Sequence, residues 1–237
     1  MFKNRAFKKE LLDDLSFDAE VFKRNLDEME FFNQYFGSKK LLLKALNKIQ
    51  NKYHKFFIEN KIVIADLGCG SADLLRAMDD WARSKKLDVE LIGIDLKSFI
   101  IQYAIEKSCL HPDIHFQVEN ILSKEFKRYS FDIVCLNSVC HHFDNISLIK
   151  LLKNLREQTR LAIIINDLHR HWLSYFSVKF LTRLFCFSYL TKNDGPLSVL
   201  RAFKKHELIQ LLYQANENNY QIRWVWPFRW EIIIWLS

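Results

Sequence analysis

Two glycines follow an apolar stretch and precede a carboxylate in the segment 64–74, IADLGCGSADL. The apolar residues 62–65 predict a buried strand, and the helical period that begins at Asp73 predicts a helix, so Gly68 and Gly70 form the turn between them. Glycine allows positive φ and lets a ligand approach the backbone, while the first turn of a helix presents unpaired N–H groups. The spacing therefore predicts a site for a small polar ligand at the end of this strand.

The charge on this turn separates classes of ligand. A dinucleotide-binding fingerprint, Gly-x-Gly-x-x-Gly, has a small residue at the position that Asp73 occupies here. A carboxylate repels a phosphate, whereas it attracts a ligand that carries an ammonium group. Two glycines alone also fit a purely structural turn, so the later motifs have to decide.

Polar residues also follow the next two expected strands. Asp95 ends the apolar segment 89–95, and an acid at the tip of the second strand of an open α/β sheet can accept hydrogen bonds from both ribose hydroxyls. NAD enzymes share this feature, so Asp95 indicates that the ligand contains a nucleoside but does not identify the cofactor. Asn120 and Ile121 follow the third strand, where an Asn is ordinarily a turn former.

Histidines and a carboxylate after the fourth and fifth strands could move a proton. The segment 131–143, FDIVCLNSVCHHF, places His141 and His142 directly after a strand, and a neutral imidazole can accept a proton from a phenol or hydroxyl near pH 7. The alternative for both is a capping or hydrogen-bonding role. Asp167 follows the apolar strand 161–166 and could orient a histidine or hold a substrate hydroxyl. The predicted catalytic residues are His142, Asp167 and His169.

In this order and spacing, the motifs over residues 62–167 resemble those of class I S-adenosylmethionine (SAM) methyltransferases. The resemblance implies SAM as cofactor, which is cationic at its amine and its sulfonium. It implies that Asn120 meets the adenine amino group, that Ile121 packs on the ring, and that a His after the fourth strand lies near the acceptor. The implied cofactor-binding residues are Asp66, Gly68, Gly70, Asp73, Asp95, Leu96, Asn120, Ile121 and Asn137.

Two further features bear on the acceptor. Methyltransferases that act on nucleobase or glutamine nitrogens often carry Asn/Asp-Pro-Pro-Tyr/Phe after the fourth strand, and this chain has Asn-Ser-Val-Cys at 137–140. An N-terminal helix, DLHRH at 167–171 and DGPLSVLRAF at 194–203 resemble a bacterial subgroup of small-molecule methyltransferases linked to quinones and phenolic polyketides. We therefore expect methylation of an oxygen, or else a carbon, of a small apolar aromatic, phenolic or quinone-like acceptor. The alternatives are an RNA or protein methyltransferase and a non-catalytic SAM-binding or membrane-peripheral module.

The pattern of elements predicts an α/β fold. The resemblance implies a Rossmann-like methyltransferase fold with a mostly parallel seven-stranded sheet and an antiparallel last strand. Pro227, which separates the two final strands, favours the antiparallel edge. We expect a helical extension at 1–60, in which Asp18 caps a helix that stops near Gly37, and a SAM-binding domain at 61–237. Ser98 is expected to cap another helix.

An apolar, aromatic insertion interrupts the domain at 171–200. Its segment 172–190 carries Lys179 and Arg183 among aromatic residues, which favours a helical lid over an apolar acceptor or, less often, a helix at a membrane surface. Core packing is the alternative. Gly195 and Pro196 predict a loop after it.

Composition restricts the partners and the compartment. The chain has 237 residues and a formal net charge of +7, but its basic residues are scattered, so we expect no nucleic-acid partner and allow peripheral membrane contact. Its five cysteines lack CxxC spacing, which predicts neither disulfides nor a metal site and favours a reducing compartment. Without an apolar N-terminal core or a run of about 18 apolar residues, we expect a cytoplasmic protein. The oligomeric state stays open.

Overall fold

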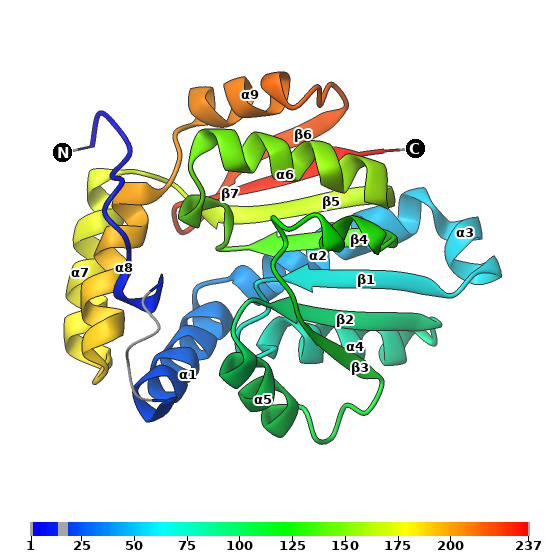
Figure 1. Cartoon of the computed structure of the whole chain (residues 1–237), viewed down its shortest axis with the longest axis horizontal. Helices are drawn as coiled ribbons and strands as arrows, with labels where there is room; N and C mark the ends of the chain where they lie inside the picture. Colours follow the sequence, from blue (N-terminus) through cyan, green and yellow to red (C-terminus); the bar gives the residue numbers. More distant parts are fainter. Residues whose placement is uncertain (1, 14–18, 237) are drawn as a thin grey trace.

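A seven-stranded sheet forms the centre of the computed structural model, which describes residues 2–13 and 19–236 (Figure 1). The strand order is β3-β2-β1-β4-β5-β7-β6. The first five strands pair in parallel, and β7 runs antiparallel to both neighbours, β5 and β6. The predicted sheet with an antiparallel end is confirmed. The bounds are β1 Ile62–Leu67, β2 Val89–Asp95, β3 Ile114–Val118, β4 Phe131–Asn137, β5 Thr159–Leu168, β6 Tyr220–Val225 and β7 Arg229–Trp235.

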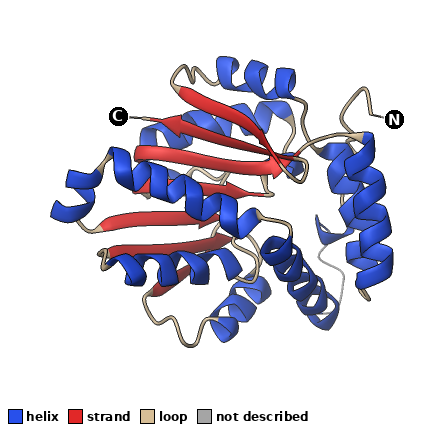
Figure 2. Cartoon of the chain, turned by 180° about the vertical axis from the view of Figure 1, so that it is seen from behind, coloured by secondary structure: helices blue, strands red, loops and turns tan. Residues whose placement is uncertain are grey.

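Helices cover both faces of the sheet, as a largely parallel sheet of apolar strands requires (Figure 2). Alternate residues of β5 point to opposite faces, so Ile164 belongs to one core layer while Ile163 and Ile165 belong to the other. The first layer is covered by α2 Ser38–Lys52, α3 His54–Glu59, α4 Asp73–Lys85 and α5 Ser98–Lys107. The second is covered by η2 Glu125–Arg128, α6 Asn145–Gln158 and α9 Lys205–Gln214.

A third group of helices lies beyond the carboxyl ends of the parallel strands (Figure 1). It contains η1 Leu11–Asp13, α1 Ala19–Tyr35, α7 Trp172–Phe185 and α8 Tyr189–Arg201. Helix α8 contacts each of the other three. The segment 1–60 is thus shared between two roles, because α2 packs on the sheet whereas α1 joins this group. No helix in the described ranges is both long enough and apolar enough to cross a bilayer.

Three of the sequence predictions concern the ends of helices. Gly37, near which the first helix is predicted to end, lies between α1 and α2. Its φ of 92° is in the left-handed region, which favours glycine at a helix end. The expected cap at Ser98 is wrong by one residue, because α5 begins at Ser98 and Lys97 is its N-cap. Asp18, the expected cap of α1, lies outside the described residues.

The loop expected at Gly195 and Pro196 is wrong, because both residues lie inside α8. A Cβ at Gly195 would stand 3.1 Å from Val178 Cγ1 and from Thr182 Cγ2 of α7. The missing side chain therefore lets α7 and α8 pack closely. This packing outweighs the weak helix propensity of Gly and Pro, from which the loop was inferred.

Candidate active site

In the glycine turn between β1 and α4, the backbone N–H groups of Gly68, Cys69 and Gly70 have acceptors within the protein. Gly68 and Gly70 have φ of 75° and 54°, and a Cβ on Gly68 would lie 2.6 Å from Val139 Cγ2. The N–H groups of Gly68 and Cys69 both donate to the carbonyl oxygen of Ile94, at 2.8 and 3.1 Å. The Gly70 N–H faces Asp95 Oδ2 at 3.4 Å. These three N–H groups are therefore engaged within the protein, and a carboxylate, Asp95, faces one of them.

Buried carboxylates surround the turn instead. Asp66 is 2% exposed, and its Oδ1 has no hydrogen-bond partner among the described residues. Burial, with the nearby charges of Asp73 and Asp95, raises the pKa of Asp66 to about 8. Burial and the charge of Glu30 raise the pKa of Asp73 to about 6. These groups would gain from a cationic ligand, so the residues present fit the ammonium group of SAM, as the sequence predicts.

A narrow cleft of about 40 Å³ follows the turn. It is lined by five of the predicted cofactor residues, Asp66, Gly68, Gly70, Asp73 and Asn137. Asn137, at the end of β4, accepts a hydrogen bond from the Asn166 amide at 2.7 Å. The structure therefore brings these five together at the carboxyl ends of β1 and β4.

The other four predicted cofactor residues lie outside this cleft. Asp95 accepts hydrogen bonds from the backbone N–H groups of Gly70 and Lys97. Leu96 is largely exposed, and Ile121 packs partly on the second core layer. Asn120 is exposed, and its Oδ1 accepts from the Leu122 N–H at 2.9 Å, which is the turn-forming role considered as its alternative.

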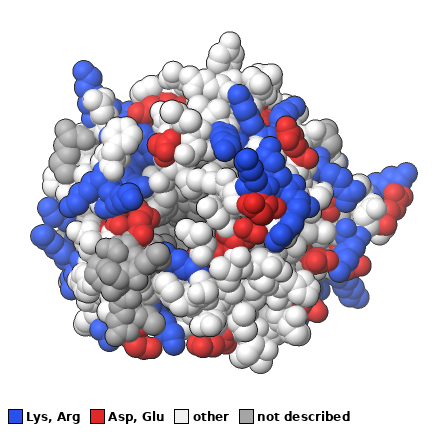
Figure 3. All heavy atoms as spheres, viewed as in Figure 1, with Lys and Arg blue, Asp and Glu red and all other residues white. Residues whose placement is uncertain are grey.

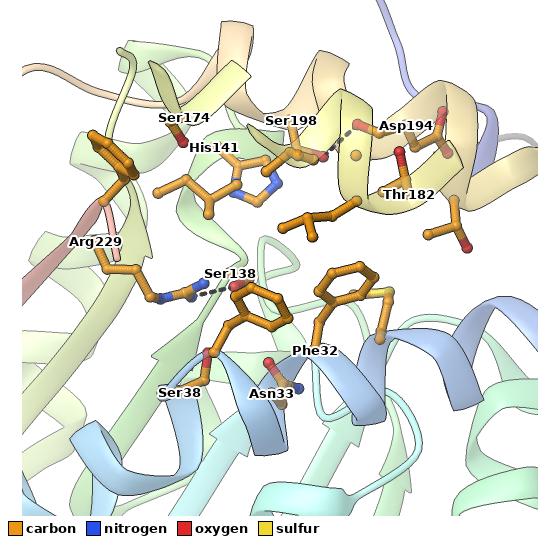
Figure 4. A pocket seen from close by; sticks show the side chains of 18 of the residues that line it. Phe32, Asn33, Ser38, Ser138, His141, Ser174, Thr182, Asp194, Ser198 and Arg229 are labelled. Atoms are coloured by element: carbon orange, nitrogen blue, oxygen red, sulfur yellow. Dashed lines mark hydrogen bonds between the residues drawn. The ribbon is translucent and has the colours of Figure 1, made fainter. Parts of the chain in front are cut away.

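A larger cavity of about 320 Å³ lies between the sheet edge and the third group of helices. Its wall is mostly apolar and includes Met29, Phe32 and Phe36 of α1, Val178 and Leu181 of α7, and Trp226 and Phe228 of the β6–β7 turn. Figure 4 shows Phe32 and Asn33 on one side and Thr182 and Ser198 on the other. The cavity and the narrow cleft share Met29, Asn33 and Ser138. The two sites are therefore adjacent.

A histidine and a buried carboxylate form a pair at the cavity wall. The short helix η3, Cys140–His142, follows β4 and brings His141 to the cavity. His141 Nδ1 lies 2.7 Å from Asp167 Oδ1, and the His141 backbone N–H donates to Asp167 Oδ2 at 3.1 Å. Burial alone would raise the pKa of Asp167, but His141 and hydrogen bonds outweigh it and lower that pKa. Asp167 is therefore ionised and orients His141.

His142 also lines the cavity, in a different set of contacts. Its Nδ1 lies 3.1 Å from Asp13 Oδ1, and its Nε2 lies 3.9 Å from Glu10 Oε2. Burial raises the pKa of Glu10 to about 7, although His142 and Arg201 oppose the rise. Arg201 donates to the His142 carbonyl oxygen at 2.7 Å, which fixes the end of η3.

Glu10, His141 and His142 bring possible metal ligands within 4.8 Å of one another, although the sequence predicted no metal site. Arg201 Nε lies 3.7 Å from Glu10 Oε1, so a cation already faces this carboxyl group. The arrangement therefore fits an internal charge network as well as a metal site.

His169 lies apart from this group. It does not line the cavity, and its Nδ1 accepts from Trp224 Nε1 at 3.2 Å. Burial, together with the charges of His171, Lys204 and Arg170, lowers the pKa of His169 to about 4. Of the three predicted catalytic residues, His142 lines the cavity, Asp167 stands behind His141, and His169 is elsewhere.

The sequence makes His141 a candidate beside His142, although only His142 is predicted to be catalytic, and it predicts neither Glu10 nor Arg229. Glu10 comes from a segment with no motif and reaches the site only through tertiary packing. Arg229 is buried, donates to Ser138 Oγ at 2.5 Å (Figure 4), and has a pKa lowered to about 10 by burial. The sequence carries one signal for Arg229, which is that a basic residue begins the largely apolar strand RWEIIIW.

Comparisons with known proteins agree with this geometry. The model of a family described as "Methyltransferase domain" matches residues 58–221. A tRNA (guanine-N(7)-)-methyltransferase from Clostridium botulinum is 27% identical over 107 residues, which cover 45% of this chain and 44% of that protein. The chain thus spans less than half the length of this curated relative.

Solved structures resemble the whole fold. The plantazolicin methyltransferase BpumL, in complex with a triazolic desmethylPZN analog and SAH, aligns with a TM-score of 0.69 at 16% identity, over 92% of this chain and 93% of that one. The DszA carbon methyltransferase aligns with a TM-score of 0.67 at 16% identity, over 89% of this chain and 57% of that one.

Proposed function

Because this chain belongs to the methyltransferase domain family, we propose that it transfers a methyl group from SAM to an oxygen of a small apolar aromatic acceptor, such as a phenol or a reduced quinone. A carbon of such an acceptor is the second possibility. The observation that carries the proposal is that the narrow acidic cleft and the larger apolar cavity are adjacent. The acidic cleft suits a cation and the apolar cavity suits a ring system, and they share Met29, Asn33 and Ser138.

The cofactor supplies an electrophilic methyl group on a sulfonium, and the chain has to align the acceptor with it and remove its proton. Asp66 and Asp73 would hold the ammonium end in the cleft. Phe32, Val178 and Leu181 would surround the acceptor and exclude water. A cavity of about 320 Å³ is in the range for a small-molecule site.

His141 is the residue that would take the proton. Since Asp167 is ionised and lies 2.7 Å from Nδ1, the imidazole keeps its proton on Nδ1 and leaves Nε2 as an acceptor. Nε2 would receive the hydroxyl proton of the acceptor as the methyl group is transferred. Asp167 then stabilises the imidazolium through the same hydrogen bond, so it is a positioning residue. His142 lines the same wall and would contact the acceptor.

RNA methylation is the second candidate function, favoured by the similarity to a tRNA methyltransferase over 107 residues. The mostly apolar cavity wall counts against a nucleobase, which would need several hydrogen-bond partners. Binding to RNA would weaken steeply as salt is raised. A filter-binding assay between low and physiological salt separates the two functions, since only the RNA proposal expects binding that persists at physiological salt.

Calorimetric titration with S-adenosylhomocysteine tests the proposal directly. We expect binding by the unaltered protein and at least a tenfold loss of affinity in Asp73→Asn, because a cationic amine loses a charged partner. Asp88→Asn, at an exposed position, is the matched control and should bind as the unaltered protein does. Absence of both heat and thermal stabilisation at millimolar ligand would overturn the proposal.

A further inference from the structure

Helix α7 has two unlike faces. One face lines the cavity through Ser174, Val178, Leu181 and Thr182. The opposite face carries large apolar side chains that are between 42% and 65% exposed, namely Trp172, Leu173, Phe176, Phe180 and Leu184. Their spacing of about four residues puts them in one stripe along the helix. A monomeric globular protein rarely leaves such a stripe uncovered.

The stripe continues onto the turn between β6 and β7. The ring of His171 lies 5.8 Å from Trp172 and stacks on Phe228 at 5.4 Å. Phe228 in turn lies 5.4 Å from Trp226, which is 69% exposed. We call the stripe of α7 together with Trp226 and Phe228 the aromatic surface. Because Trp226 and Phe228 also line the cavity, the aromatic surface borders the acceptor site.

The chain segments that carry the aromatic surface are basic. Residues 169–193 and 220–230 contain Lys and Arg but no Asp or Glu, and the acidic residues that follow them, Asp194 and Glu231, are buried. Lys179, Arg183 and Lys192 lie on α7 and α8, and Phe2 contacts Tyr175 of α7 at 5.6 Å, which brings the basic N-terminal segment alongside. Figure 3 shows Lys and Arg side chains along the edge of the molecule where Figure 1 places α7. Glu28 of α1 accepts hydrogen bonds from the backbone N–H groups of Phe187 and Ser188, just beyond the end of α7.

We propose that the aromatic surface docks on an anionic lipid bilayer and that the apolar acceptor enters the cavity from the lipid. Aromatic and aliphatic side chains would enter the interface, with Trp172 and Trp226 at the level of the headgroups, while the basic residues contact lipid phosphates. A second copy of the chain fits less well, because a symmetric pair would place Lys179 and Arg183 of both copies face to face. Docking itself involves neither the cofactor nor His141, His142 and Asp167, whereas the entry of the acceptor from the lipid rests on the proposed function.

Flotation with vesicles tests the proposal on the unaltered full chain. We expect it to float with vesicles of phosphatidylcholine and phosphatidylglycerol in a 70:30 ratio, and more weakly with pure phosphatidylcholine. Phe176→Ser/Phe180→Ser should lower the partition coefficient at least tenfold, because two apolar anchors are lost. The matched control is Ile146→Ser/Tyr213→Ser, which changes side chains that are 81% and 75% exposed on α6 and α9 and should leave binding unchanged.

Lys179→Gln/Arg183→Gln tests the electrostatic part. We expect about a tenfold loss on anionic vesicles and little change on neutral ones. Thermal unfolding and S-adenosylhomocysteine binding by each variant check folding, so a failure of docking is distinguishable from a failure of the proposed function. The proposal is wrong if the unaltered protein stays unbound, if Phe176→Ser/Phe180→Ser binds as well as the control, or if the protein forms a dimer that this pair of substitutions dissociates.

Discussion

At the scale of single residues, the site depends on ionisable groups that packing holds in particular protonation states. Asp167 stays ionised because it accepts hydrogen bonds from the backbone and the ring of His141. Asp66 has no such partner, so burial raises its pKa to about 8. An aspartate thus orients a histidine at position 167, whereas the aspartate at position 66 would be stabilised in its charged form by a cation.

The proposed roles of the two neighbouring histidines can be separated by substitution. His141→Gln should lower kcat about 100-fold to 10,000-fold, the range for a lost general base, and leave the affinity for S-adenosylhomocysteine unchanged. His142→Gln should act mainly on KM, since we propose that this residue contacts the acceptor. Steady-state kinetics with His115→Gln, at an exposed position on β3, as the control would decide. Equal loss of kcat in both active-site variants would contradict the assignment.

Cofactor affinity should rise with pH. In the free protein Asp66 and Asp73 have pKa values near 8 and 6, so at pH 6 protons must leave before the carboxylates can pair with an ammonium group. Calorimetry in buffers of different ionisation enthalpy should show proton release, and affinity should increase from pH 6 to pH 8.5. In Asp66→Asn the increase above pH 7 should disappear. A pH-independent affinity would argue against an ammonium group at Asp66.

The stability of the cofactor-free protein should change in the opposite sense. The pKa of Asp66 is higher in the folded chain than in the unfolded one, so its contribution to stability is present below the unfolded value near 4 and is lost as pH rises toward about 8. Thermal unfolding should therefore show a Tm that falls over this range. Asp66→Asn should reduce the fall, whereas Asp88→Asn should not.

At the scale of elements, the acceptor cavity depends on the close pair α7 and α8. Gly195 allows this approach, because a Cβ there would already stand 3.1 Å from Val178 and Thr182. Both of these α7 residues also line the cavity. The spacing of the two helices thus sets the width of the acceptor site.

Gly195→Leu tests this dependence. The added side chain should lower the free energy of unfolding by about 1–3 kcal/mol, a typical cost of overpacking, and should raise KM for the acceptor. The affinity for S-adenosylhomocysteine should stay the same, since Gly195 does not line the narrow cleft. Lys192→Leu places the same side chain at an exposed position of α8 and serves as the control for both measurements. Unchanged KM in Gly195→Leu would show that the helix spacing does not shape the site.

At the scale of the whole molecule, the N-terminal segment holds the sheet and the third group of helices together. Arg5 donates to the carbonyl oxygens of Arg201, His141 and Phe143 and to Asn145 Oδ1. One side chain thereby connects α8, η3 and the start of α6. The backbone at His141 and the end of α8 are thus held by a residue far from both in sequence.

Arg5→Gln should loosen these parts together. We expect the free energy of unfolding to fall by about 2 kcal/mol, because hydrogen bonds from a charged donor to partly buried carbonyl groups are lost. Hydrogen exchange should accelerate in residues 2–13 and in η3, with little change in β1 and β2. Lys9→Gln, at an exposed position, is the control. Uniform acceleration through the sheet would instead indicate a general loss of stability.

The sequence by itself determined the sheet, the glycine turn and the acidic residues around that turn. These follow from apolar periodicity, from glycine spacing and from residues that end strands, and each of those signals lies within a few residues. Only the tertiary structure decided that His141 is the histidine that pairs with Asp167, that Glu10 and Arg229 reach the cavity, and that Gly195 lies within a helix. Such contacts join residues far apart in the chain, and packing there outweighs local propensity, so no short stretch of sequence encodes them.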